Sequence, residues 1–172
     1  MKKKLKTSKV LVAHNILANA KYGKMESADR IKVWKIARKL APVAEKFDAD
    51  TKDAAEKMKP IEDFNDRLQA AQEFEKAQKD KTIDATKLKM GAAEYGAFVK
   101  ELQAYNKEVE EAVKEFGEKE IEIEFEPISE SAFEKLMDSN DWTFGQTTAL
   151  SEIICEPAET EEEEKPKDKK KK

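Results

Sequence analysis

Two stretches of the chain place apolar residues alternately three and four positions apart, and this spacing constrains the fold more than any other feature. The first ladder consists of Val33, Ile36, Leu40, Val43 and Phe47. The second consists of Tyr95, Phe98, Leu102, Tyr105, Val109, Ala112 and Phe116. Residues at this spacing form one stripe along an α-helix, and such a stripe must pack against another apolar surface. The simplest arrangement is an antiparallel helical hairpin in which each stripe covers the other.

Two prolines interrupt the first of these helices. The helix is expected to begin at Ser27, a common N-cap residue, and its apolar register continues to about residue 78. Pro42 and Pro60 each remove a backbone donor, which costs ~3 kcal/mol inside a straight helix. We therefore expect a kink or a break just before each proline. The sequence leaves open whether this segment is one bent helix or three pieces.

The clearest β-strand follows the second helix, which is expected to end at Gly117. Apolar residues alternate strictly with glutamates here, as is typical of a half-buried strand: Glu120, Ile121, Glu122, Ile123, Glu124, Phe125 and Glu126. One strand cannot stand alone. The N-terminus is the best partner because it alternates in the same way: Met1, Lys2, Lys3, Lys4, Leu5 and Lys6. Antiparallel pairing would place lysines opposite glutamates, each pair contributing ~0.2–1 kcal/mol.

Short helices are expected around this strand pair. Helical spacing runs over residues 8–17. Ser131 and Glu134 have the spacing of a capping box, in which the two side chains satisfy free amides at the start of a helix. A last short helix is expected over 147–155, with apolar residues on its inner side.

Together these elements predict a mainly α fold: a long antiparallel, coiled-coil-like helical hairpin with a small two-stranded β element and short C-terminal helices. Residues 1–156 would form this single helical-hairpin domain. The Glu/Lys-rich tail over 157–172 is expected to be disordered, because it has nothing to bury. Charged residues make up 41% of the 172-residue chain, which long amphipathic helices tolerate because most of their surface is solvated.

The charge is unevenly distributed along the chain. Residues 1–40 contain ten Lys and two Arg against Glu26 and Asp29, a net charge of +10. The whole chain carries -4, so residues 41–172 carry -14. Such asymmetry can indicate attraction to nucleic acid or to a membrane surface. It can equally indicate that the two parts neutralise each other within the fold, and the glutamate-rich strand is an evident partner for this.

The chain contains few of the residues and motifs that commonly take part in catalysis. His14 is its only histidine and Cys155 its only cysteine, so no disulfide within the chain and no Cys-rich metal site can form. No phosphate-binding loop, HExxH motif or EF-hand spacing occurs. No apolar run approaches the ~20 residues that span a bilayer. We therefore predict a cytoplasmic, non-enzymatic protein without cofactor, metal, small-molecule substrate or membrane contact.

Two groups of residues are candidates for partner contacts. Basic side chains near aromatic residues can bind phosphates and stack on bases. The candidate nucleic-acid contacts are Arg30, Lys32, Lys35, Arg38 and Lys39. The lysines among them point away from the apolar stripe, so they can also be read as the solvated side of the helix. Trp142 and Phe144 lie in a short loop, where aromatic residues either close the end of the core or protrude as interface anchors.

The order of the elements adds a resemblance. A basic start, LKTSKVLVAHNILANAKYGK, leads to the helix SADRIKVWKIARKLAPV, the hairpin return FVKELQAYNKEVE and the strand IEIEFEPIS. In this order the chain resembles a family of small, uncharacterised phage and prophage proteins over about residues 5–155. The resemblance implies a mobile-element origin, a location in the host cytoplasm or the virion, and a role in assembly or host interaction. It supplies no site residues.

These observations predict an interaction or assembly protein that binds a protein partner, or a second copy of itself, through the helical hairpin scaffold. The alternative is a nucleic-acid-associated protein that uses its basic N-terminal third, residues 2–39.

Overall fold

The computed structural model describes residues 1–80, 84 and 87–156. Over these residues the chain is mainly α-helical with one two-stranded antiparallel sheet, which confirms the predicted fold class. In chain order the elements are β1 (Lys2–Lys6), α1 (Thr7–Ala18), α2 (Ser27–Lys57), α3 (Phe64–Lys79), α4 (Ala92–Glu118), β2 (Glu120–Glu124), α5 (Glu130–Met137) and α6 (Phe144–Ile154). The predicted disordered tail over 157–172 lies outside the described residues.

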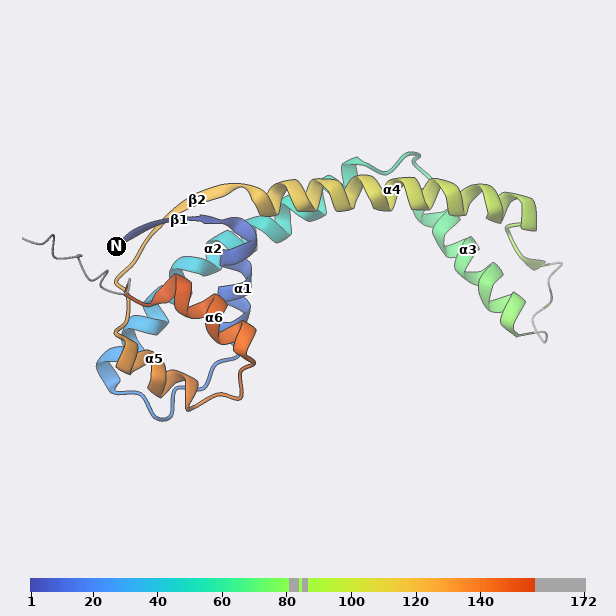
Figure 1. The fold of residues 1–172 in the computed structure, drawn as a ribbon. Helices are drawn as coiled ribbons and strands as arrows, with labels where there is room; N and C mark the ends of the chain where they lie inside the picture. Colours follow the sequence, from blue (N-terminus) through green and yellow to red (C-terminus); the bar gives the residue numbers. More distant parts are fainter. Residues whose placement is uncertain (81–83, 85–86, 157–172) are drawn as a thin grey trace, which may run out of the picture.

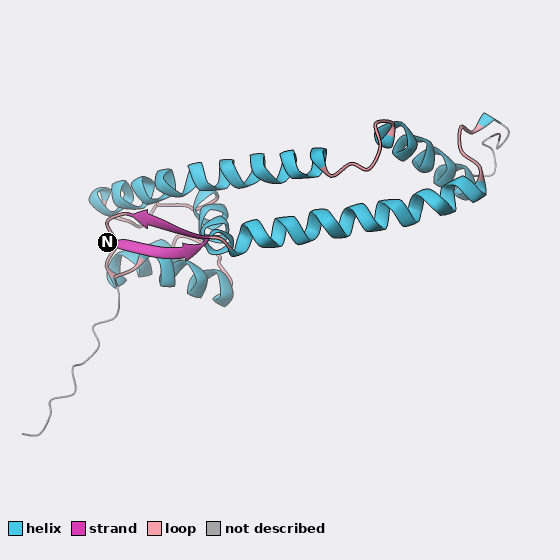
Figure 2. Cartoon of the chain, turned by 90° about the horizontal axis from the view of Figure 1, so that it is seen from above, coloured by secondary structure: helices cyan, strands magenta, loops and turns pink. Residues whose placement is uncertain are grey.

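The elements form a lobe from which a long helical hairpin projects (Figure 1). The lobe contains both strands, α1, α5, α6 and the first half of α2, and α2 then runs outward beside α4 (Figure 2). Contacts along the hairpin fix its antiparallel direction. The Tyr105 hydroxyl donates to the carbonyl oxygen of Ala55 at 2.9 Å, and nearer the tip Arg67 Nη1 donates to the Glu101 carboxylate at 2.8 Å. The predicted hairpin is therefore present, with α2 and α3 on one side and α4 on the other.

The first predicted helix is divided at one proline and not at the other. α2 continues unbroken through Pro42, whereas the chain around Pro60 leaves the helix before α3 begins. Leu40 and Ala44 are buried on either side of Pro42, and this tertiary packing offsets the lost hydrogen bond. No residue from 55 to 62 is buried, so the helix has no comparable support near Pro60.

The two strands pair as the alternation predicts. The antiparallel register places Lys2 opposite Glu124, Lys4 opposite Glu122 and Lys6 opposite Glu120. The ion pairs are diagonal: Lys2 Nζ lies 3.2 Å from the Glu122 carboxylate, and Lys6 pairs with Glu118 at the end of α4. This pairing raises the pKa of Lys6 and lowers that of Glu118. Part of the basic N-terminal charge is therefore neutralised within the fold.

The end of α4 differs from the expectation in one detail. The helix continues past Gly117 to Glu118, and Gly117 does not have a positive φ angle, so it is not the C-cap. It is buried beside α1, where an added Cβ atom would lie 3.6 Å from the Cβ atom of Ser8. The small residue allows the end of α4 to lie against the start of α1.

The predicted capping box at Ser131 and Glu134 is wrong. α5 begins two residues earlier, and the hydroxyl of Ser129 is the group that accepts a hydrogen bond from the backbone of the first turn. A capping box does occur at the start of α6, where Thr143 and Gln146 each accept a backbone hydrogen bond from the other. Ser129 and Ser131 are only two residues apart, and the one without a Glu or Gln three residues later is the N-cap, so the local pattern alone did not decide where this helix begins.

The apolar residues of the described part of the chain form two separate cores. The main cluster fills the lobe with seventeen buried residues from β2, α1, α2, α5, α6 and the connecting segments, and the partly buried Leu5 of β1 packs against it. The arm cluster lies at the far end of the hairpin and contains Phe64, Ala70, Ala71, Met90 and Phe98. Between them, Phe47 and Phe116 are only half-buried and belong to neither cluster. The middle of the hairpin is therefore its least covered part.

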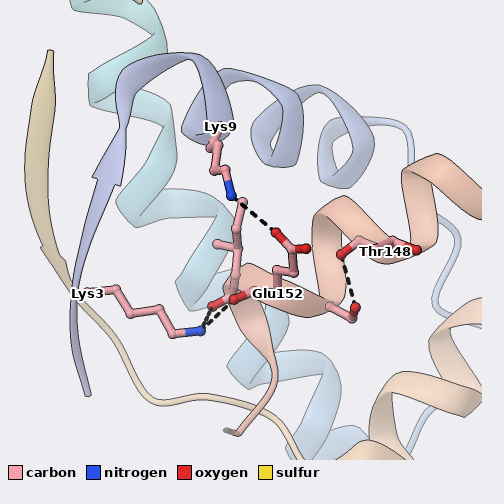
Figure 3. Close-up of polar contacts among 6 residues, drawn as sticks. Lys3, Lys9, Thr148 and Glu152 are labelled. Carbon is pink, nitrogen blue, oxygen red and sulfur yellow. Dashed lines mark hydrogen bonds and ion pairs between the residues drawn. The ribbon is translucent and has the colours of Figure 1, made fainter. Parts of the chain in front are cut away.

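Lysines from the N-terminal segment fasten the last helix to the lobe (Figure 3). Lys3 Nζ donates to the carbonyl oxygens of Glu152 and Ile153 at 2.7 and 2.8 Å. These carbonyls belong to the last turn of α6, which has no helical partners for them and carries a partial negative charge. Lys9 Nζ adds an ion pair with the Glu152 carboxylate at 3.2 Å. The burial of Lys3 lowers its pKa.

Candidate interaction surface

The solvent side of α2 within the lobe carries two large apolar residues among cations. α2 directs Val33, Ile36 and Leu40 into the core, and the helical period directs the positions between them to solvent. Ile31 and Trp34 are 53% and 55% exposed. Two such residues one turn apart form a patch, which is more informative than a single exposed apolar residue. We call this surface the α2 outer face, and it consists of Arg30, Ile31, Trp34, Lys35, Arg38 and Lys39.

Arg38 and Trp34 contact each other on this face. The guanidinium carbon of Arg38 lies 4.8 Å from the centroid of the Trp34 ring, which is a cation–π contact. The two residues are four positions apart on one helix, so adjacent turns hold them together. The pair presents apolar area, hydrogen-bond donors and positive charge at one place. Tryptophan and arginine are the residues most enriched at the energetic centres of protein interfaces.

Most of the predicted nucleic-acid contacts remain unpaired on this face. Lys32 is the exception, because its ammonium pairs with the Glu126 carboxylate at 2.8 Å. That contact raises the pKa of Lys32 and lowers the pKa of Glu126. Within the described residues, four exposed candidates form no ion pair: Arg30, Lys35, Arg38 and Lys39. Acidic groups within the fold therefore neutralise lysines of β1 and Lys32. None of the acidic groups that the structure describes pairs with these four cations.

The structure separates the two aromatic candidates of the C-terminal loop. Trp142 is partly buried and packs against the main cluster, as a residue that closes the core would. Phe144, the first residue of α6, is 86% exposed. The capping box at Thr143 holds the helix start that carries Phe144. Of the two predicted interface residues, Phe144 is thus the one that lies free on the surface.

Cys155 and His14 are the only cysteine and histidine of the chain, and both are partly buried. Burial raises the pKa of the Cys155 thiol to about 11, so it is protonated and weakly nucleophilic at neutral pH. The Nδ1 atom of His14 is buried without a hydrogen-bond partner among the described residues. Across those residues, no three His, Cys, Asp or Glu side chains gather as a metal ion would require. None of the described helices combines the length and apolarity needed to cross a membrane.

Comparison of the chain with protein-family models, with curated proteins and with solved structures finds no match.

Proposed function

We propose that this protein is a non-enzymatic interaction or assembly protein that binds a protein partner through the α2 outer face. The observation that carries the proposal is the exposed Ile31–Trp34 patch with Arg38 stacked on the Trp34 ring. The patch lies on a long helix anchored in the main core, so its side chains are held in place before binding. A preorganised surface of this kind loses less entropy when it binds.

The free energy gained by covering the exposed apolar side chains supports a protein partner. An aromatic side chain buries 150–250 Å², and a partner would cover roughly the exposed half of Trp34 and of Ile31. At about 25 cal/mol per Å², covering both would contribute about 3–5 kcal/mol. That is a large share of a micromolar affinity, which corresponds to about 8 kcal/mol. The surrounding cations would then select an acidic partner surface and orient it.

Nucleic-acid binding is the second candidate function. The four cations of the α2 outer face that form no ion pair with any described residue favour it, because each could neutralise a phosphate, and Trp34 could stack on a base. Four phosphate contacts would make the logarithm of the binding constant fall with the logarithm of salt concentration with a slope of about -3 to -4. This candidate ranks second because Lys32 is already paired with Glu126, so the cationic stripe is shorter than the sequence suggests.

The test introduces a photoreactive amino acid at Lys35 and irradiates cells that make the protein. A matched control carries the same group at Lys100, which is exposed on α4. We expect a covalent protein adduct from position 35 and none from position 100, and the Trp34→Ala change should abolish the adduct while the circular dichroism spectrum stays unchanged. An adduct with nucleic acid alone would refute the first candidate and support the second. Absence of any adduct at position 35 would refute both.

The biological setting that we propose is a phage or prophage, in the host cytoplasm or the virion. It is supported by the resemblance in the order and character of the sequence elements, and the partner would then belong to the particle or to the host. The neighbouring genes distinguish these cases. Tail or packaging genes would favour an assembly role, early-region genes would favour a role directed at the host, and a neighbourhood without phage genes would contradict the proposed origin.

A further inference from the structure

The described part of the chain ends beside α2. The backbone N–H of Glu156, the last described residue, donates to the carbonyl oxygen of Ile128 at 3.1 Å. Two residues before Ile128, the Glu126 carboxylate binds the ammonium of Lys32 on α2 at 2.8 Å. Glu126 raises the pKa of Lys32 most, and Asp29 and Glu156 raise it further. The chain therefore leaves the described part of the structure close to the helix that carries the α2 outer face.

The sequence that follows is strongly acidic. Residues 159–164, which we call the acidic segment, are five glutamates and one threonine, a net charge of -5. The α2 outer face carries four exposed cations that pair with no described acidic group: Arg30, Lys35, Arg38 and Lys39. One chain thus carries two opposite charges of nearly equal size, and the acidic one follows shortly after Glu156.

The length of chain between Glu156 and these glutamates allows the two charges to meet. An extended chain spans at most about 3.3–3.6 Å per residue. Glu161, the first of four consecutive glutamates, can therefore lie up to about 17 Å from Glu156, and the last of the four up to about 27 Å. Along α2, Lys35 and Lys39 lie only about 5 and 10 Å from Lys32. The acidic segment can therefore reach the cations without any change in the described structure.

Binding of the acidic segment would leave the apolar part of the face open. Its glutamates can neutralise cations, but it has no large apolar side chain to cover Ile31 and Trp34. A protein partner with both acidic and apolar groups makes both kinds of contact and can displace the segment. A polyanion that offers charge alone must instead compete with a segment that is tethered to the face. The segment would thus favour partners that also cover Trp34.

We propose that the acidic segment binds the four cations of the α2 outer face of its own chain, and that the protein partner displaces it. The displacement rests on the proposed function, since it concerns the access of the partner to that face. The short tether gives the segment an effective concentration of about millimolar at this face, so binding within one chain is favoured over pairing between chains. Each exposed ion pair is weak, which keeps the segment displaceable.

Cross-linking with a carbodiimide tests the contact, because this reagent joins a carboxylate only to an amine that touches it. An equal mixture of unlabelled and isotope-labelled full-length protein shows by mass spectrometry whether a cross-link lies within one chain. We expect cross-links from 161–164 to Lys35 or Lys39 of the same chain. They should disappear at about 1 M salt, where the screening length is about 3 Å.

Lys4 is the matched control for this cross-link. It is exposed and forms no ion pair within the described residues, and its neighbour Lys3 contacts the carbonyl oxygen of Ile153, close to Glu156. Lys4 is therefore also within reach of the acidic segment, and it should form no cross-link with 161–164. Cross-links from 161–164 only to the lysines of 165–172, only between chains, or equally to Lys4 would overturn the proposal.

An acidic probe measures whether the segment closes the face. The probe is a fluorescein-labelled peptide of six glutamates, whose binding to the full-length protein is followed by fluorescence anisotropy. A variant with all four glutamates of 161–164 changed to Gln should bind the probe about tenfold more tightly than wild type, because the cations are then available. A control variant makes the same charge change at four exposed glutamates of α4 and should bind like wild type: Glu94, Glu108, Glu110 and Glu115. Equal affinity of the two variants would overturn the proposal.

The photoreactive group at Lys35 separates this inference from the proposed function. The cross-link and the probe need no partner, so they report on the acidic segment alone. In cells, changing the four glutamates of 161–164 to Gln should raise the yield of the protein adduct several-fold. An unchanged yield would overturn the displacement while the proposed function stands. Absence of an adduct from both forms would refute the proposed function, and with it the displacement, whatever the cross-linking shows.

Discussion

Replacing Phe98 with Ala should unfold the far end of the hairpin while the lobe remains folded. Phe98 is fully buried in the arm cluster. Its ring centroid lies 5.5 Å from that of Phe64, and the guanidinium of Arg67 lies 4.8 Å from the ring. Phe98 is thus the residue on which the packing of α3 against α4 depends most.

The expected loss is large relative to the size of this cluster. A buried Phe→Ala change costs about 3–5 kcal/mol, of which the aromatic and cation–π contacts account for about 1–2 kcal/mol. The described arm cluster contains five buried residues, two of them alanines, against seventeen in the main cluster. Half-buried residues around Phe47 and Phe116 separate the two cores, so little of the loss should reach the lobe.

Hydrogen exchange followed by mass spectrometry measures this outcome. In the Phe98→Ala variant, amides of 64–79 and 92–105 should lose most of their protection, while those of 10–17 and 150–154 should keep theirs. Ile36→Ala opens a cavity in the main cluster at a cost of about 2–5 kcal/mol. In this variant the amides of 10–17 and 150–154 in the lobe should lose protection. Equal loss of protection in all four segments of the Phe98→Ala variant would contradict the separation of the two cores, because it would show one cooperative unit.

Three further predictions concern residues of the lobe. Trp142→Ala should lower the free energy of unfolding in urea by about 2 kcal/mol, below the usual range for a buried Trp because the ring is only partly covered. At about pH 8.5, where half of free cysteine is ionised, Cys155 should react with iodoacetamide about a hundredfold more slowly than free cysteine, because burial raises its pKa to about 11. Lys3→Met should lower the free energy of unfolding by about 1–2 kcal/mol, because two carbonyls of α6 lose a charged donor.

Each of these outcomes has a control. Phe144→Ala, at a fully solvated ring, should change the free energy of unfolding by less than about 0.5 kcal/mol, and a loss as large as that of Trp142→Ala would contradict the assignment of Trp142 to the core. Cys155 should react at the rate of free cysteine once the protein is unfolded in urea; equally fast reaction in the folded protein would show that it is accessible. Lys4→Met changes a lysine on the exposed side of β1, and an equal loss there would show that the Lys3 contacts are not responsible.

The strand pair was predictable because the alternation of apolar and charged residues can be recognised within a few residues of each strand. The side chains of Lys2, Lys4 and Lys6 repeat at the spacing of the glutamates in β2, and the structure places them opposite Glu124, Glu122 and Glu120. The hairpin was predictable for the same reason, since its ladders repeat over many turns. The helix boundaries were not. Pro42 remains within α2 because the surrounding core supports the helix there. The residues next to the proline in the sequence do not show whether such tertiary packing exists.

The candidate surface was only partly predictable. The cations of the α2 outer face were identified from their position near aromatic residues, but Lys32 was included with them because its partner Glu126 is distant in sequence. Ile31 and Trp34 were missed as an exposed patch. Their signal was present, since neither has the register of Val33, Ile36 and Leu40. Whether an apolar residue out of register is covered by another element, however, depends on the tertiary fold.

Hydroxyl-radical labelling of Trp34, in cells and in dilute purified protein, shows directly whether the α2 outer face is covered by a partner. Phe144 serves as the internal reference because it is the most exposed of the large apolar side chains in the described part of the chain. If the α2 outer face binds protein, labelling of Trp34 relative to Phe144 should fall several-fold in cells, and the purified protein should show the same protection at high concentration if the partner is a second copy. An unchanged ratio in cells would contradict the assignment of this face as an interaction surface.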